Sequence, residues 1–137
     1  MATSASNRGK RGEALFKTYI ESLCKFSDSA FYRLPDAHAG SMQATLADFL
    51  FLRRGKVFLI EVKEVAHDFR LPHGNFDKSQ VARQRLWKDA GATSLVLIYH
   101  STINLWRGYD VERFIEREGG SWDLRDTAPK LLRDVLE

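Results

Sequence analysis

The sequence predicts an α/β fold in which helices flank a mixed central β-sheet. Segments with helical periodicity alternate with short apolar runs along the chain. Two β-type runs, residues 47–53 and 56–63, are separated only by Arg54 and Gly55, which is typical of an antiparallel hairpin. A helical segment then connects this hairpin to a continuous apolar run over residues 94–99, as in a right-handed βαβ crossover.

The elements before the hairpin are predicted from the spacing of apolar residues. Residues 12–24 are expected to form a helix because their apolar side chains share one face. That face contains Leu15, Phe16, Tyr19, Ile20 and Leu23. A short strand is predicted over residues 30–34, ending at Pro35, and a loop over residues 36–45.

The elements after the hairpin are predicted from apolar runs and capping residues. Residues 65–75 have no regular pattern, and residues 77–90 form a helix that ends at Gly91. Asp110 is a candidate N-cap for a further helix. The remaining predictions are strands over residues 94–99 and 103–106, and helices over residues 111–118 and 129–136.

The composition indicates one globular domain. A chain of 137 residues has the usual length of a single domain, and we place a basic tail at residues 1–11 and the domain at residues 12–137. Cys24 is the only cysteine, so an internal disulfide is excluded. No apolar run approaches the roughly 20 residues of a membrane span, and residues 1–10 lack the apolar core of a secretory signal. We therefore expect a cytoplasmic protein without membrane association.

Strand periodicity places two carboxylates opposite each other. A two-residue turn at Arg54 and Gly55, or a four-residue loop over residues 53–56, sets a register in which Asp48 lies opposite Glu61, whereas a three-residue loop would not. Directly opposed Cβ atoms lie roughly 4.5–5.5 Å apart, a separation at which like charges destabilise a sheet. Lys63 follows on the same face as Glu61. A divalent cation between the carboxylates would remove the repulsion, and hard carboxylate oxygens favour Mg²⁺ or Mn²⁺.

The same pattern also has a non-functional interpretation, in which carboxylates at the end of a strand simply face water. Two surrounding features favour the functional one. The net charge of +3 suits a polyanionic partner, and Gln80 lies near the start of the helix that follows the hairpin.

These residues resemble the PD-(D/E)XK nuclease superfamily. The resemblance rests on Asp48, on residues 60–64 with the sequence Ile-Glu-Val-Lys-Glu, and on an N-terminal helix carrying Glu13. Residues 69–76 and Gln80 extend the similarity to the RecU-type Holliday-junction resolvases, which implies a restriction-endonuclease-like core. It covers residues 47–100 well and the first helix loosely.

The resemblance implies a role for each matching residue. Asp48 and Glu61 would be catalytic metal ligands for Mg²⁺, with Mn²⁺ as a substitute, and Gln80 an accessory ligand. Lys63 would stabilise charge on the phosphate or orient the attacking water. Glu13 matches an acid that several resolvases place near the metal, although an ordinary surface glutamate fits its position equally well.

The resemblance also implies the partner. We expect a homodimer that cuts four-way DNA junctions by paired nicks, in a bacterial cell or a phage-infected host. Basic residues of the tail, the hairpin, the following loop and the next helix are the candidate DNA contacts: Arg8, Lys10, Arg11, Arg54, Arg70, Lys78 and Arg83.

Three other functions stay open. The first is a nuclease of the same fold that acts on other branched DNA or on duplex DNA. The second is a DNA-binding module of this fold without catalysis, which would have no need for Asp48, Glu61, Lys63 and Gln80 together. The third is a structural protein, which would leave the opposed carboxylates unexplained.

Overall fold

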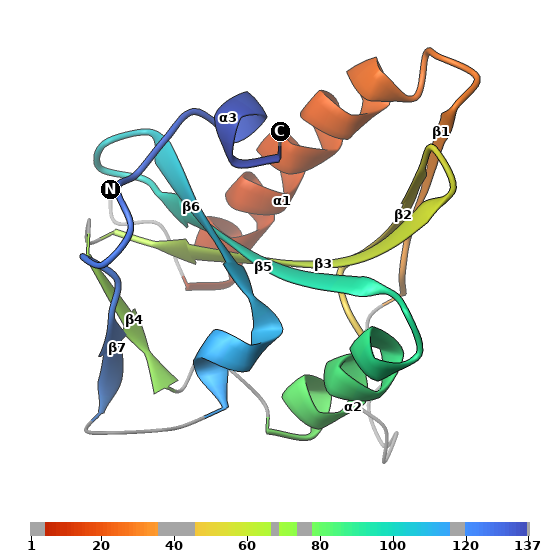
Figure 1. The fold of residues 1–137 in the computed structure, drawn as a ribbon. Coiled ribbons are helices and arrows are strands. Elements are labelled where there is room, and N and C mark those ends of the chain that lie inside the picture. The colour runs from red at the N-terminus through yellow and green to blue at the C-terminus, as the bar shows by residue number, and fades with distance from the viewer. Residues whose placement is uncertain (1–4, 36–45, 67–68, 74–77, 116–119, 137) are drawn as a thin grey trace.

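The protein folds around a five-stranded mixed sheet with the strand order β1-β2-β3-β5-β6 (Figure 1). This computed structural model describes residues 5–35, 46–66, 69–73, 78–115 and 120–136, and it describes only the backbone of residues 5–10. The sheet elements and helices are α1 (Ala5–Leu23), β1 (Ser29–Arg33), β2 (Phe49–Arg53), β3 (Lys56–Val65), α2 (Lys78–Asp89), β5 (Thr93–His100), β6 (Leu105–Asp110) and α3 (Leu132–Leu136). The predicted fold class, a mixed central sheet with flanking helices, is confirmed.

The hairpin between β2 and β3 forms in the predicted register. Arg53 pairs with Lys56, and the ladder continues to Phe49 opposite Ile60. Arg54 and Gly55 both have positive φ angles, of 51° and 79°, which matches the two-residue turn that suits the right-handed twist of strands. This register fixes which side chains of β3 share a face.

The crossover from β3 through α2 to β5 makes the centre of the sheet parallel. Phe58 pairs with Thr93 at one end of this ladder, and Val65 pairs with His100 at the other. Gly91, with a φ of +119°, follows the end of α2 in a conformation that side chains rarely adopt. The predicted βαβ connection is therefore present, and it covers one face of the sheet with α2.

Two apolar cores lie on the two faces of the sheet. The α1 core contains Phe16 and Ile20, packed against residues of β2, β3 and β5 such as Ile60. The core on the α2 side contains Val81 and alternate residues of β5, such as Val96. Alternate side chains along a strand point to opposite faces, so the odd and even positions of the central strands enter different cores.

Several predicted boundaries are wrong. The first helix begins at Ala5 and not at residue 12, so residues 5–11 of the predicted tail are helical. The strand predicted at 103–106 is β6 (Leu105–Asp110), because residues 101–104 form the turn from β5. Of the helix predicted at 111–118, residues 111–114 form a 3-10 turn, η2 (Val111–Phe114), which Asp110 caps as expected, and residues 116–118 lie outside the described residues. The last helix starts at Leu132, because Lys130 is held extended by two backbone hydrogen bonds to Trp106.

A second, two-stranded sheet was not predicted. It pairs β4 (Arg70–Pro72) with β7 (Ser121–Asp123), and lies below the main sheet beside η2 (Figure 1). Three-residue strands carry too little periodicity to be recognised in a sequence. The loop predicted at 36–45 lies outside the described residues. Within the described part of the chain, no helix is long and apolar enough to cross a membrane.

Candidate active site

The hairpin brings Asp48 and Glu61 together at the end of β2 and β3 opposite the turn. Asp48 directly precedes β2, and continuing the ladder by one residue beyond Phe49 and Ile60 places it opposite Glu61. Asp48 is 7% exposed and Glu61 4% exposed. Two carboxylates that are opposed and buried are costly to maintain, because neither hydration nor a distant counterion screens them.

Three neighbouring groups satisfy part of this pair. The backbone N–H of Val62 donates to Asp48 Oδ2 at 2.7 Å. Gln80 Nε2 donates to Glu61 Oε2 at 2.8 Å, and Lys63 Nζ lies 3.2 Å from Glu61 Oε1. The structure therefore brings Asp48, Glu61, Lys63 and Gln80 into one cluster, with α2 supplying the amide and the hairpin supplying the charges.

Burial perturbs both carboxyl groups. Removal from water, and then the negative charges of Glu61 and Glu13, together raise the pKa of Asp48 to about 8. Burial also raises the pKa of Glu61, against the opposing effect of the Lys63 ammonium. A carboxyl pair with these properties retains a proton near neutral pH unless a cation replaces it.

Glu13 and Arg33 complete the cluster from the other side of β2. Arg33 Nη2 donates to Glu13 Oε2 at 2.9 Å and lies 3.8 Å from Asp48 Oδ1. The same guanidinium donates through Nη1 to the backbone oxygens of Leu34 and Asp48. Arg33 therefore connects α1 to the aspartate, and Glu13 belongs to the site and not to the open surface of the helix.

The charges of this cluster favour a cation. Glu13, Asp48 and Glu61 carry three negative charges when ionised, and Lys63 and Arg33 carry two positive charges. No group of three or more His, Cys, Asp or Glu side chains in the described ranges is arranged to hold a metal by itself. Asp48 and Glu61, with the Gln80 amide beside them, are the oxygen donors of the kind that Mg²⁺ prefers.

The predicted DNA contacts with described side chains do not all lie beside the carboxylates. Arg54 is paired with Asp28 at 3.0 Å and lies at the hairpin turn, roughly 20 Å from Glu61 along β3. Arg70 is exposed on β4, where its guanidinium lies over the ring of Phe69. Arg11 is 48% exposed and pairs with Glu64.

Two other candidates lie on α2 close to Gln80. Lys78 is exposed at the first position of the helix, and Arg83 is half-buried one turn after Gln80. Arg8 and Lys10 lie on the first turns of α1, and their side chains are outside the described part of the protein.

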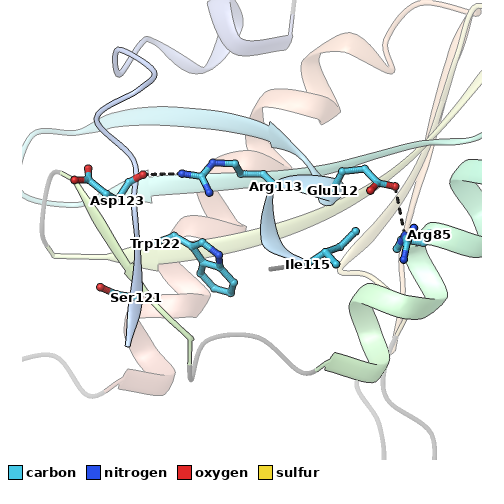
Figure 2. A pocket seen from close by; sticks show the side chains of 7 residues that line it. All are labelled: Arg85, Glu112, Arg113, Ile115, Ser121, Trp122 and Asp123. Atoms are coloured by element: carbon cyan, nitrogen blue, oxygen red, sulfur yellow. Dashed lines mark hydrogen bonds and ion pairs between the residues drawn. The ribbon is translucent and has the colours of Figure 1, made fainter. Parts of the chain in front are cut away.

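A hollow on the surface lies away from these residues. A pocket of about 750 Å³ opens between η2, β7 and α2, and its walls include two ion-paired arginines (Figure 2). Arg85 pairs with Glu112 at 3.4 Å, and Arg113 donates to the backbone oxygen of Asp123. None of the predicted catalytic or metal-binding residues lines this pocket. The buried charges, and not the size of the hollow, identify the candidate site.

Sequence reasoning missed three residues that support the site. Arg33 is the only charged residue of β1. A cation on a half-buried strand requires an acceptor, so its position in the sequence could have indicated an acidic partner. Gln84 Nε2 donates to the backbone oxygen of Leu46, two residues before Asp48. Glu64 was used only as part of a motif, and its contacts with α1 depend on a packing that periodicity does not reveal.

Comparison with known proteins yields a match in structure alone. No protein-family model matches the chain, and no curated protein does. Among solved structures, the chain is similar to Hjc of Archaeoglobus fulgidus, a Holliday junction resolvase from an archaeal hyperthermophile. The two share 18% identity and a TM-score of 0.64, over 94% of this chain and all of that one. The chain therefore has the fold of this resolvase.

Proposed function

We propose that the protein is a metal-dependent, structure-selective endodeoxyribonuclease that resolves four-way DNA junctions. The observation that carries the proposal is the opposed, buried pair of Asp48 and Glu61 beside Lys63, within a fold that is also that of a Holliday junction resolvase. The matching resolvase is of the Hjc type and not of the RecU type, so the proposal is made at the level of the PD-(D/E)XK superfamily.

The donor set fits a divalent metal. Asp48 and Glu61 would hold Mg²⁺, with Mn²⁺ as a substitute, and Gln80 would supply an accessory oxygen or orient Glu61. When bound, the ion supplies Lewis-acid stabilisation of the phosphate and of the leaving oxygen, and it eases the deprotonation of water. The raised pKa of Asp48 supports this fit, because a carboxyl pair that keeps a proton in the absence of metal is the pair that gains most from a cation.

The other residues act on the phosphodiester. Lys63 is held by Glu61 at 3.2 Å, so its ammonium has a fixed place beside the carboxylates and would donate to a phosphate oxygen as negative charge develops there. Glu13, oriented by Arg33, would accept a proton from water or hold that water in line.

Resolution of a junction requires two cuts on opposed strands. A homodimer with two-fold symmetry would present two such sites to a substrate that has the same symmetry. Lys78 and Arg83 flank Gln80 on α2 and would bind phosphates next to the site, whereas Arg54 would contact an arm further away.

The test is cleavage of an end-labelled four-way junction, a flap and a linear duplex with Mg²⁺, Mn²⁺ or EDTA. Wild type is compared with Asp48→Ala and with Asp89→Ala, which removes an exposed aspartate at the end of α2 as the matched control. We expect paired, symmetric nicks in the junction alone. These nicks are lost in EDTA and with Asp48→Ala, and they are retained with Asp89→Ala.

The other outcomes distinguish the alternatives. Cleavage of all three substrates would keep the nuclease and reject the junction specificity. Binding of the junction by wild type without cleavage in either metal would indicate a non-catalytic DNA-binding module. Cleavage that survives Asp48→Ala would reject this site altogether.

A further inference from the structure

A second buried carboxylate lies on the opposite face of β3. The side chain of Glu64 has no exposed surface, and it points toward α1, on the face that Ile60 and Val62 share. Its Oε1 accepts the backbone N–H of Gly12 at 2.8 Å, and its Oε2 accepts Arg11 Nη2 at 2.6 Å. The two carboxylate oxygens therefore accept one hydrogen bond each from Arg11 and Gly12, the two residues of α1 directly before Glu13.

The helix approaches the sheet closely at this contact. A Cβ atom on Gly12 would lie 3.3 Å from Glu64 Oε1, 3.4 Å from Val62 Cγ1 and 3.5 Å from Tyr99 Cβ. A side chain at this position would therefore make ordinary contact with Val62 and Tyr99, but Glu64 Oε1 would have to shift by a few tenths of an ångström. Gly12 allows the backbone of α1 to reach the carboxylate itself.

Apolar packing alone does not define the orientation of α1. Phe16 and Ile20 are fully buried against the sheet, but hydrophobic contacts are non-directional and allow a helix to rotate or slide. The two hydrogen bonds to Glu64 are directional and fix both the rotation and the height of the helix at residues 11 and 12. An apolar residue at position 64 would fill the same space without this constraint.

We infer that Glu64 is a positioning residue, which holds α1 so that Glu13 reaches the Asp48–Glu61 pair. The chain of contacts runs from Glu64 to Gly12, then to the adjacent Glu13, and from Glu13 through Arg33 to Asp48. The inference rests on the proposed function, because it assigns Glu64 to the cleavage reaction through Glu13.

The experiment is a double-mutant cycle with Glu64→Ala, Glu13→Ala and the double variant, measured as kcat and KM on the four-way junction. We expect Glu64→Ala to lower kcat about 10- to 100-fold, the cost of a small misplacement of a reacting group, and to change KM less than about threefold. In the Glu13→Ala background, Glu64→Ala is expected to have no further effect on kcat.

Two further variants separate positioning from stability. Glu64→Gln keeps an oxygen acceptor for the Gly12 N–H and is expected to recover most of kcat. Gly12→Ala keeps the carboxylate but displaces its Oε1 slightly from the Gly12 N–H, and is expected to reproduce part of the loss. Glu21→Ala removes an exposed glutamate from the same helix and serves as the control that leaves kcat unchanged.

Each result decides the inference. Losses that multiply in the double variant, or a Glu64→Ala protein that is only less stable with normal kcat, would show a purely structural role and overturn it. A normal kcat for Glu13→Ala would also overturn it, because nothing would then be positioned. If the wild type cuts no DNA, the proposed function is rejected before any variant is compared, and the inference is rejected with it.

Discussion

Glu61 and Glu64 lie three residues apart on β3 and are both buried, yet their surroundings are opposite. On the α1 face, Glu64 receives a backbone N–H and a guanidinium, one for each oxygen. On the α2 face, Glu61 is bonded to Gln80 and Lys63 but lies opposite another buried carboxylate, Asp48. The charge of the first carboxylate is balanced by hydrogen-bond donors of α1, whereas the second lies beside another negatively charged group. Burial therefore does not distinguish the two carboxylates, and the charges of their neighbours do.

The largest expected effect concerns the opposed pair of Asp48 and Glu61. Glu61→Gln keeps the shape and the contact with Gln80 but removes the charge, so we expect junction cleavage to fall by at least about 1,000-fold, about 4 kcal/mol in the activation barrier. Single-turnover kinetics measure this loss. Near-normal cleavage by Glu61→Gln would mean that the two faces of β3 do not differ in function.

The pair also predicts an unusual pH dependence of stability. The pKa of Asp48 is raised from near 4 in the unfolded chain to about 8 in the folded protein. The contribution of the protonated Asp48 carboxyl to the free energy of unfolding is thus complete below pH 4 and is lost as the pH rises toward 8. In EDTA, we expect urea unfolding to give a free energy lower at pH 8 than at pH 5.5 by about 2 kcal/mol, allowing for relaxation and water entry.

Asp48→Asn is the matched variant for this measurement. The amide oxygen still accepts the Val62 N–H, but no charge develops. The decrease between pH 5.5 and pH 8 should be largely absent in this variant. An equal decrease in both proteins would assign the pH dependence to other groups.

For Glu64, whose two oxygens both accept hydrogen bonds, we expect that removing the carboxylate destabilises the protein. Glu64→Ala leaves the Gly12 N–H and the Arg11 guanidinium without their acceptor, so the free energy of unfolding should fall by about 1–3 kcal/mol. Asp48→Asn, measured at pH 8 in EDTA, should instead raise it. If both substitutions destabilise the protein equally, the contrast between the two faces is wrong.

Addition of Mg²⁺ should also distinguish Asp48 from Glu64, through a smaller change in the free energy of unfolding. At a Mg²⁺ concentration ten times the dissociation constant, we expect the wild type to gain about 1.4 kcal/mol in the free energy of unfolding. Thermal shift in the absence of DNA measures this gain. Glu64→Gln should retain it and Asp48→Asn should lose it, and a gain that persists in Asp48→Asn would place the ion elsewhere.

The smallest effect is expected at the hairpin turn. Arg54 is 70% exposed and paired with Asp28, so Arg54→Ala should change the free energy of unfolding by less than about 0.5 kcal/mol. If Arg54 contacts a junction arm, the variant should bind the junction more weakly, with a salt dependence reduced by about one ion. Unchanged binding in a salt titration would remove Arg54 from the DNA surface.

The sequence was sufficient for the part of the site that depends on local geometry. The register of the hairpin, and with it the apposition of Asp48 and Glu61, follows from a two-residue turn and strand periodicity. The contact of Gln80 with Glu61 was anticipated only through resemblance to a family. Arg33 and Glu64 act across β1, β3 and α1, and the sequence does not specify how a helix is rotated on a sheet.

The predicted boundaries fail for a related reason. Periodicity predicts an α-helix after Asp110, but Val111–Phe114 form a 3-10 turn in which Phe114 packs against Trp122 of β7. The start of the last helix is delayed because Lys130 is bonded to Trp106 of β6. In both places a tertiary contact overrides the local preference of the chain.

The short connection between β2 and β3 also predicts when the two carboxylates come together during folding. β2 and β3 are joined by two residues, so the hairpin can form early, while Asp48 and Glu61 are still hydrated and their repulsion is weak. Gln80 reaches Glu61 from α2, which follows the hairpin in the chain, so we expect the pair to lose water only when α2 packs against the sheet. The electrostatic cost therefore arises late, so removing the charge at Asp48 should slow unfolding more than it accelerates the initial collapse.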